Sequence, residues 1–359
     1  MFDELSTDEW VANFFELNEG NPDANIFFQA MAESRTDVLD FCLEPGCRGG
    51  REILDILGPD KKGVTVMHIA ALHGYLEVMK WIQEKIKEEL QEIDADEFIQ
   101  PDKEGIMPIH NAAKGGHREA VEWLLENGAN VNFRDGKEQT PMHHAAGNGR
   151  VGVMKSLKDA ADIKAEDIYG SWPIHSAIAC DKIESIRCLV KELGMDVNAK
   201  NNHKNHNGKT PLFFAAMLGK TNIIRFLVDL GADVNARDND GETPLFTAAQ
   251  AGQIESIKCL VGLKADVNAK SDNGMTPIFL AAGTGQIESI KCLVDLKADV
   301  NAKTDNGMTP IFLAAGSGQI GSIKCLKSLG AKLEDKEGAI DLALRYNQTE
   351  AAKWLRANF

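Results

Sequence analysis

The twelve residues "DNGMTPIFLAAG" stand at Asp272–Gly283 and again, unchanged, at Asp305–Gly316. Their prolines belong to a longer series with spacings of 33, 32, 38, 33, 33 and 33 residues: Pro108, Pro141, Pro173, Pro211, Pro244, Pro277 and Pro310. A fixed period of this length indicates one structural unit stacked many times, each copy contacting its neighbours. We therefore interpret the duplicated segment as a structural unit and not as a doubled active site.

Each residue type in the unit has a local structural reason. Gly274 allows a turn that a Cβ would oppose, and Thr276–Pro277 opens a first helix, with threonine as the capping acceptor and proline in the first turn. The small pair Ala281–Ala282 lets neighbouring helices approach closely, and Gly285 ends the helix. A second helix follows, with apolar residues on one face, as in Ile254, Ile257, Leu260 and Val261.

The combined pattern G-x-T-P-L-H-x-A-A-x-x-G and G-A-D-V-N-A resembles the ankyrin repeat. The resemblance implies an all-α solenoid of helix-turn-helix units with β-turn fingers, forming a curved rod of about ten repeats including degenerate ends. We expect a capping or docking helix over residues 1–20 and a degenerate repeat over 21–59. Eight repeats over 60–332 and a C-terminal capping repeat over 333–359 complete the predicted division.

Composition favours a soluble protein that does not bind nucleic acid. The formal charge is −15, of which residues 1–60 hold −11, and phosphate backbones attract Lys and Arg rather than acidic chains. The sequence lacks an apolar run of eighteen residues, and its first residues do not have the pattern of a secretory signal. Seven cysteines without CxxC pairs favour a reducing compartment. We expect a cytoplasmic monomer with no membrane insertion.

Four copies depart from the repeat inside the array. The interval from Val66 to Pro108 is 42 residues, which predicts a longer second helix and loop, and the interval of 38 before Pro211 predicts an extended polar finger, mostly from "NAKNNHKNHNGKT". Trp172 stands where most copies have threonine. Glu138 replaces the turn glycine, and we expect Gly136 to relocate that bend. Such irregular copies are where individual function is expected.

The histidines and cysteines follow the repeat, which favours structural roles. His68, His110, His143 and His175 share one slot, and the resemblance implies that they bond to the next repeat; phenylalanine fills this slot in the later copies. The motif HxxH at His203 and His206 lacks two further ligands for a metal. Layers at about 8–10 Å are too far apart for disulfides along the buried ladder Cys188, Cys259, Cys292 and Cys325.

No familiar catalytic motif is present, so we expect no enzyme, cofactor or metal. In the ankyrin family, partners usually meet the concave face formed by the turn tips and the first helices. Projected onto this chain, that face selects sixteen residues as a protein-binding surface: Leu72, His73, Lys103, Glu104, Ile106, Lys114, Lys137, Gln139, Asn148, Ile168, Tyr169, Ser171, His206, Lys209, Met217 and Leu218. Leu72, Ile106, Ile168, Tyr169, Met217 and Leu218 would make it unusually apolar.

The resulting hypothesis is a protein-binding scaffold or adaptor with a partner of unknown identity. In one alternative, an adaptor docks through its acidic N-terminal helix, within "LSTDEWVANFFEL". In the other, the chain is a secreted effector of an intracellular bacterium, which would work in the host cytosol. The near-identical repeats between Asn239 and Lys303 are expected to supply mainly length and stability.

Overall fold

The computed structural model describes Ala30 and residues 33–43, 59–89 and 100–359. The chain divides into two compact units, Met1–Ala177 (unit 1) and Ile178–Phe359 (unit 2). Across the described ranges the structure is helical, and the β-structure there is a single antiparallel bridge between Asn201 and Lys209. The prediction of an all-α solenoid is confirmed within each unit, whereas the predicted helix at residues 1–20 lies outside the described residues.

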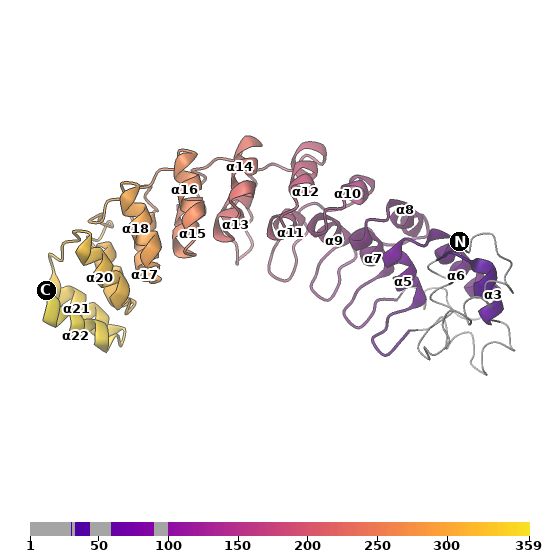
Figure 1. Cartoon of the computed structure of the whole chain (residues 1–359), viewed down its shortest axis with the longest axis horizontal. Coiled ribbons are helices and arrows are strands. Elements are labelled where there is room, and N and C mark those ends of the chain that lie inside the picture. Colours follow the sequence, from indigo (N-terminus) through magenta and orange to yellow (C-terminus); the bar gives the residue numbers. More distant parts are fainter. Residues whose placement is uncertain (1–29, 31–32, 44–58, 90–99) are drawn as a thin grey trace. The chain divides into compact units, whose positions relative to one another are not determined.

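Unit 1 is a series of helix pairs. Its helices are α3 (Thr36–Leu43), α5 (Val66–His73), α6 (Leu76–Glu89), α7 (Pro108–Gly115), α8 (Arg118–Glu126), α9 (Pro141–Gly147), α10 (Val151–Leu157) and α11 (Pro173–Ala179), the last of which ends just beyond the unit boundary. First helices pack on first helices, as α5 on α7 and α7 on α9, and second helices on second helices, as α6 on α8. The loops before α7, α9 and α11 extend from the same side of these helices (Figure 1).

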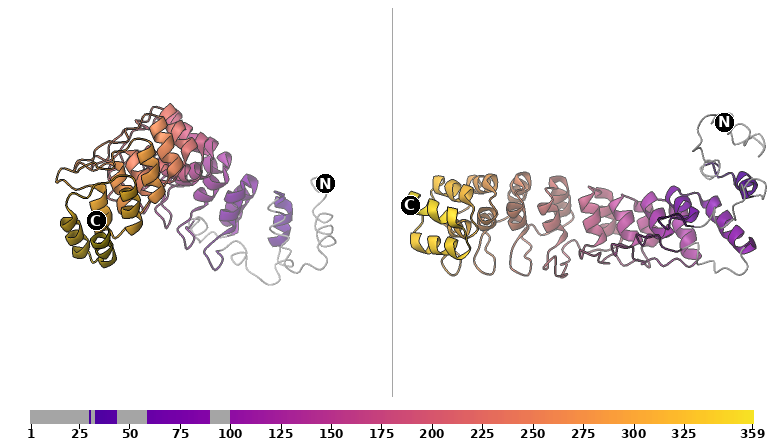
Figure 2. Two further views of the ribbon diagram at one scale, coloured as in Figure 1. Left: turned by 60° about the vertical axis from the view of Figure 1, so that its left-hand side comes forward. Right: turned by 90° about the horizontal axis from the view of Figure 1, so that it is seen from below.

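Unit 2 repeats this arrangement. It contains α12 (Ile183–Arg187), η2 (Cys188–Glu192), α13 (Pro211–Met217), α14 (Thr221–Asp229), α15 (Pro244–Gln250), α16 (Ile254–Gly262), α17 (Pro277–Gly283), α18 (Ile287–Asp295), α19 (Pro310–Gly316), α20 (Ile320–Ser328), α21 (Lys336–Arg345) and α22 (Thr349–Asn358). The first helices α13, α15, α17, α19 and α21 pack in sequence, as do the second helices α14, α16, α18 and α20. The right-hand view of Figure 2 shows their loops side by side along one edge.

The core comes from the repeated small and branched residues. Both alanines of each pair are fully buried, as at Ala281 and Ala282, and so are Ile257 and Leu260 on the inner face of α16. The ladder cysteines Cys188, Cys259, Cys292 and Cys325 are buried, and they form no disulfide among the described residues. Each repeat therefore buries its apolar face only when a neighbour packs against it.

The threonine caps were predicted wrongly in most copies. Proline does take a first-turn position. Among the described helix starts, the hydroxyl of Thr65 accepts the N–H of His68, whereas those of Thr210, Thr243 and Thr276 accept no helix N–H. The hydroxyls of Thr210, Thr243 and Thr276 are buried without a hydrogen-bond partner. In these copies the residue three positions further on is phenylalanine, whose ring offers the hydroxyl no hydrogen-bonding atom.

The two inserted segments take different forms. The longer second helix is confirmed, since α6 has 14 residues where α16 has 9; the loop after it lies partly outside the described residues. The finger before Pro211 is closed by the Asn201–Lys209 bridge. One further inserted residue is absorbed by η2, a π-helical turn that continues α12. The helix thus keeps its buried face despite the added residue.

Candidate partner-binding surface

Most first helices are preceded by a four-residue turn, here called a finger; the finger before α13 is longer and is closed by the Asn201–Lys209 bridge. The described fingers are 60–63, 102–105, 135–138 and 167–170 in unit 1, and 238–241, 271–274 and 304–307 in unit 2. In unit 1 the first residue is aspartate, whose Oδ1 accepts two backbone N–H groups, as Asp102 does from Glu104 at 2.9 Å and Ile106 at 2.8 Å. Sequence reasoning missed this aspartate, although it recurs three residues before the turn glycine. The two hydrogen bonds to this aspartate hold the backbone conformation of the finger in the absence of a binding partner.

The bend at Glu138 corrects a prediction. Glu138 itself adopts the left-handed conformation, with φ of 59°, and Gly136 does not. Asp135 sets the position of the bend, because its Oδ1 accepts the N–H groups of Lys137 at 2.8 Å and Gln139 at 2.9 Å. The bend therefore stays in the common register, and glutamate bears the backbone strain that glycine avoids elsewhere.

Gly136 is needed for a different reason, the contact between neighbouring fingers. Its N–H donates to the carbonyl of Glu104 at 2.7 Å, and a Cβ on Gly136 would lie 2.5 Å from that oxygen. Ile168 donates in the same way to Lys137 at 3.0 Å, and in unit 2 Asp272 donates to Asp240 at 2.9 Å. One backbone hydrogen bond therefore joins each finger to the next within a unit, and we call this series the finger ladder.

The repeated histidine joins the first helix to the neighbouring loop, as the resemblance implied. The Nε2–H of His68, His110 and His143 donates to a main-chain carbonyl further along the chain at 2.9–3.0 Å, while Nδ1 accepts an N–H at its own helix start, as from Met107 to His110 at 3.0 Å. Burial, followed by the nearby His144, lowers the pKa of His110 to about 4. These imidazoles are neutral structural groups.

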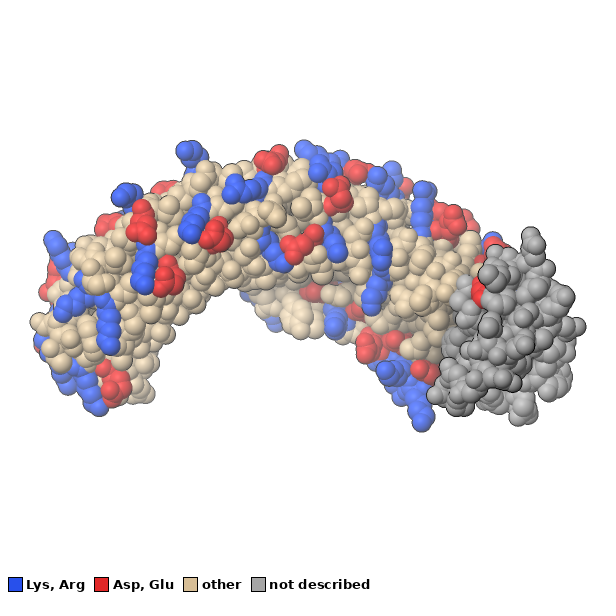
Figure 3. Space-filling view, in the orientation of Figure 1, with Lys and Arg blue, Asp and Glu red and all other residues tan. Residues whose placement is uncertain are grey.

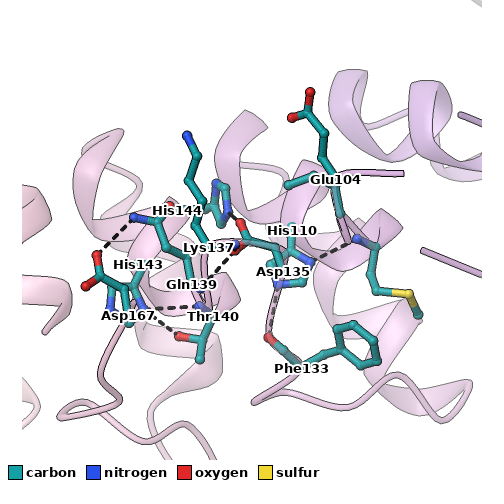
Figure 4. A network of polar contacts seen from close by, with 12 residues as sticks. Glu104, His110, Phe133, Asp135, Lys137, Gln139, Thr140, His143, His144 and Asp167 are labelled. Atoms are coloured by element: carbon teal, nitrogen blue, oxygen red, sulfur yellow. Dashed lines mark hydrogen bonds and ion pairs between the residues drawn. The ribbon is translucent and has the colours of Figure 1, made fainter. Parts of the chain in front are cut away.

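A polar cluster lies at the base of the fingers in unit 1 (Figure 4). His144 on α9 donates through Nε2 to Oδ2 of Asp135 at 2.8 Å, and Gln139 donates to Asp167 on the next finger at 3.5 Å. Burial opposes the charge of Asp135, but hydrogen bonds from His144 and from the Gln139 and Lys137 amides outweigh it, so the pKa of Asp135 is lowered. The carboxylate is thus held charged and fully bonded.

Most of the predicted surface residues of unit 1 are exposed. They are His73, Lys103, Glu104, Lys114, Lys137, Asn148, Ile168 and Tyr169. Ile168 and Tyr169 are 47% and 63% exposed, which is unusual for such apolar side chains. Leu72, Ile106, Gln139 and Ser171 are only partly exposed, and the carbonyls of Ile106 and Ser171 accept the histidine bonds. Among the described residues of unit 1, the exposed large apolar side chains are those of finger 167–170.

In unit 2 the predicted residues differ more in exposure. Met217 and Leu218, at the end of α13, are each 37% exposed, and Lys209 is partly exposed. His206 was expected on the surface but is buried, at 7% exposure, with its ring 5.8 Å from that of Phe214. His206 belongs to the finger that the Asn201–Lys209 bridge closes, and sequence spacing alone did not indicate its burial.

The second helices present a different surface. Charged side chains of both signs are interspersed over them in the space-filling view (Figure 3). Many form exposed pairs within one helix, such as Lys258–Glu255 and Lys291–Glu288, each at 2.8 Å. Such pairs contribute little to binding or stability. The fingers and the ends of the first helices are thus the more distinctive surface of each unit.

The described residues carry neither a metal-binding cluster nor a membrane-spanning helix. No group of three or more His, Cys, Asp or Glu residues there could hold a metal ion. None of the described helices is long and apolar enough to cross a lipid bilayer.

Comparison with known proteins identifies ankyrin repeats along most of the chain. A family model described as "Ankyrin repeats (3 copies)" matches residues 8–135, 109–201, 199–271 and 246–337. Ankyrin repeat domain-containing protein 37 of Mus musculus is 36% identical over 105 residues, 29% of this chain and 63% of that protein. The Neurogenic locus Notch protein of Drosophila melanogaster is 33% identical over 106 residues, 29% of this chain and 4% of its own length. This chain thus covers less than two thirds of each of these relatives.

Proposed function

Because the chain belongs to the ankyrin-repeat family, we propose that it is a non-catalytic scaffold or adaptor that binds a protein partner through its fingers and first-helix ends. The observation that carries the proposal is finger 167–170, where Ile168 and Tyr169 are exposed on a backbone held by Asp167 and the finger ladder. A rigid exposed aromatic residue loses little conformational entropy on binding.

Charge around this finger supports a defined partner chemistry. The neighbouring finger tips present Lys103, Glu104 and Lys137, all exposed. Apolar anchors with a polar rim are typical of the centre and edge of protein interfaces. Within the proposal, the partner brings an apolar pocket for Tyr169 and acidic groups for the lysines.

The direct test replaces the anchor. Full-length chain carrying Ile168→Asp and Tyr169→Glu is used to capture partners from cytosol, with quantitative mass spectrometry as the readout. We expect at least a tenfold loss of the partners captured by the natural chain, with an unchanged circular dichroism spectrum. Ile287→Glu, which charges an exposed apolar residue on α18, is the matched control and should keep the capture. Equal capture by a folded double variant would refute the placement.

The remaining parts of the proposal concern context. We propose that the chain acts as a monomer in a cytosol, either its own or, if it is a secreted effector of an intracellular bacterium, that of a host. Light scattering measures the first, and proteomics of infected cells tests the second. Deleting residues 1–20 tests whether the fingers or the acidic N-terminal segment is the docking element. Capture through the fingers should survive the deletion, whereas capture through the N-terminal segment should not.

A further inference from the structure

The finger tips of the two units have opposite charge. In unit 1 the two tip residues before the left-handed position include Lys61, Lys62, Lys103, Lys137 and one acid, Glu104. In unit 2 the same tip positions hold Asn239–Asp240, Asp272–Asn273 and Asp305–Asn306, all exposed. Since all these positions lie outside the core, folding does not require this difference. It indicates that unit 2 faces a ligand of different charge from the ligand of unit 1.

A buried carboxylate below these tips lacks a full set of partners. The side chain of Asp238 has no exposed surface, and its Oδ1 accepts the N–H groups of Asp240 at 3.0 Å and Glu242 at 2.9 Å. Its Oδ2 has no hydrogen bond, and Nζ of Lys209 lies 3.8 Å away. An unsatisfied buried carboxylate oxygen is costly, so its retention calls for a physical explanation.

The matching position in unit 1 shows what is missing. Oδ2 of Asp135 receives Nε2 of His144, the third residue after Pro141. The third residue after Pro244 is Thr247, whose hydroxyl is also buried without a hydrogen-bond partner. Threonine is too short to supply the bond that histidine makes. A hydrogen-bond donor is therefore absent beside Oδ2 of Asp238, whereas Asp135, one of the four finger aspartates of unit 1, has one.

Glu242 adds a second carboxylate to this place. It is partly exposed and its carboxylate makes no hydrogen bond within the described part of the chain, so an incoming group meets it first. Burial, with the charge of Asp238, raises the pKa of Glu242, and burial also raises the pKa of Asp238. Lys209 offsets only one of the two charges. A further positively charged donor would stabilise both carboxylates.

Beyond finger 238–241, an apolar recess opens between the next two fingers, 271–274 and 304–307. It is a cavity of about 220 Å³ lined by Asn273, Met275, Thr304, Asp305, Asn306 and Met308. Two methionines can adapt to an unbranched or aromatic side chain. Asp305 at its rim continues the acidic series from Asp240 and Asp272.

We infer that the fingers of unit 2 bind an extended basic segment of a partner protein. A lysine or arginine of that segment would pair with the accessible carboxylate of Glu242 and offset the charge of the buried Asp238 beside it, and an apolar side chain would enter the recess between Met275 and Met308. Adjacent repeats are about 10 Å apart, so a recess between the first and second fingers beyond Glu242 is about 15 Å from it. An extended chain advances about 3.3 Å per residue, so four or five residues would separate the two anchors. The inference rests on the proposed function and names the partner chemistry of a second surface.

The test uses the full chain and a fluorescent nine-residue peptide containing two arginines and, four residues from the first, one leucine. Fluorescence anisotropy should show saturable binding that weakens with salt. Asp238→Asn keeps the acceptor for the finger amides, and together with Glu242→Gln it should weaken binding at least tenfold. Glu255→Gln, which removes a charge from the outer face of α16, should change binding less than twofold.

Two further measurements separate the anchors and the alternatives. Met275→Ser with Met308→Ser should weaken the leucine peptide at least fivefold and leave a leucine-to-serine peptide unchanged. Equal binding of the arginine peptide and its glutamine analogue, or undiminished binding by the folded Asp238→Asn, Glu242→Gln variant, would overturn the inference. So would displacement of the peptide by millimolar calcium, which would assign the carboxylates to a cation. Loss of capture through Tyr169 is a separate result and tests only the proposed function.

Discussion

The neutral buried His110 predicts that unit 1 loses stability as the pH falls from 7 to 5. Its side chain is fully buried, and burial together with His144 lowers its pKa from 6.5 to about 4. In the unfolded chain the imidazole regains its ordinary pKa, so between these values the unfolded state binds more protons. Protonation therefore favours unfolding, and the stabilisation present above pH 6.5 is lost progressively towards pH 4.

The expected size follows from the two pKa values. At pH 7 the folded imidazole is almost fully neutral and the unfolded one is about three quarters neutral, whereas at pH 5 the unfolded imidazole is nearly all charged and the folded one is mostly neutral. The free energy of unfolding should fall by about 2 kcal/mol over this interval from His110 alone. Burial lowers the pKa of His68 and His143 as well, so their contributions have the same sign.

The assay compares the natural chain with His110→Phe in urea unfolding at pH 7, 6 and 5, followed by circular dichroism. Phenylalanine fills this slot in the later repeats, as at Phe246, so the variant should fold. Losing two hydrogen bonds should lower its stability at pH 7 by about 1–3 kcal/mol. Its loss between pH 7 and 5 should be about 2 kcal/mol smaller than that of the natural chain. Equal losses, or an NMR titration of His110 near pH 6.5, would refute the reasoning.

Three other substitutions or modifications test the structure. Glu138→Gly should stabilise the protein by about 1 kcal/mol in thermal unfolding, since it relieves a φ of 59°; a lower melting temperature would contradict this. Phe279→Ala should destabilise by about 3–5 kcal/mol in urea unfolding, because the ring is fully buried, and a cost below 1 kcal/mol would disprove close packing there. Iodoacetamide should label exposed Cys180 well before Cys292, whose thiol pKa is raised by burial, as site-resolved mass spectrometry would show.

The fold was predictable because the same physical constraint recurs in every copy. Alanine pairs, glycine turns and a proline at each helix start together fit one arrangement, in which neighbouring repeats stack. The errors came from contacts that depend on one residue type at one place. The hydroxyl of Thr243 lacks a partner because Phe246, unlike histidine, presents no ring nitrogen. Glu138 keeps the bend because Asp135 fixes the register.

The candidate surface was predictable only in outline. The repeat register correctly indicated that Lys103, Lys137 and Tyr169 are exposed. It did not indicate that His206 would be buried, because four inserted residues have no counterpart from which to infer their path. The unsatisfied oxygen of Asp238 depends on the length of the side chain at position 247, a tertiary distance that spacing does not give.

The finger ladder has a consequence for amide hydrogen exchange. Loop amides exposed to water normally exchange quickly, whereas an amide held in a hydrogen bond exchanges only when that bond opens. Each finger should therefore contain slowly exchanging protons beside fast ones, with Gly136 and Ile168 among the slow. Since every bond of the ladder joins only adjacent repeats, local opening of one finger should expose the amide donated to it and leave more distant ones protected. Hydrogen exchange measured residue by residue would then show which hydrogen bonds of the finger ladder a bound partner keeps closed.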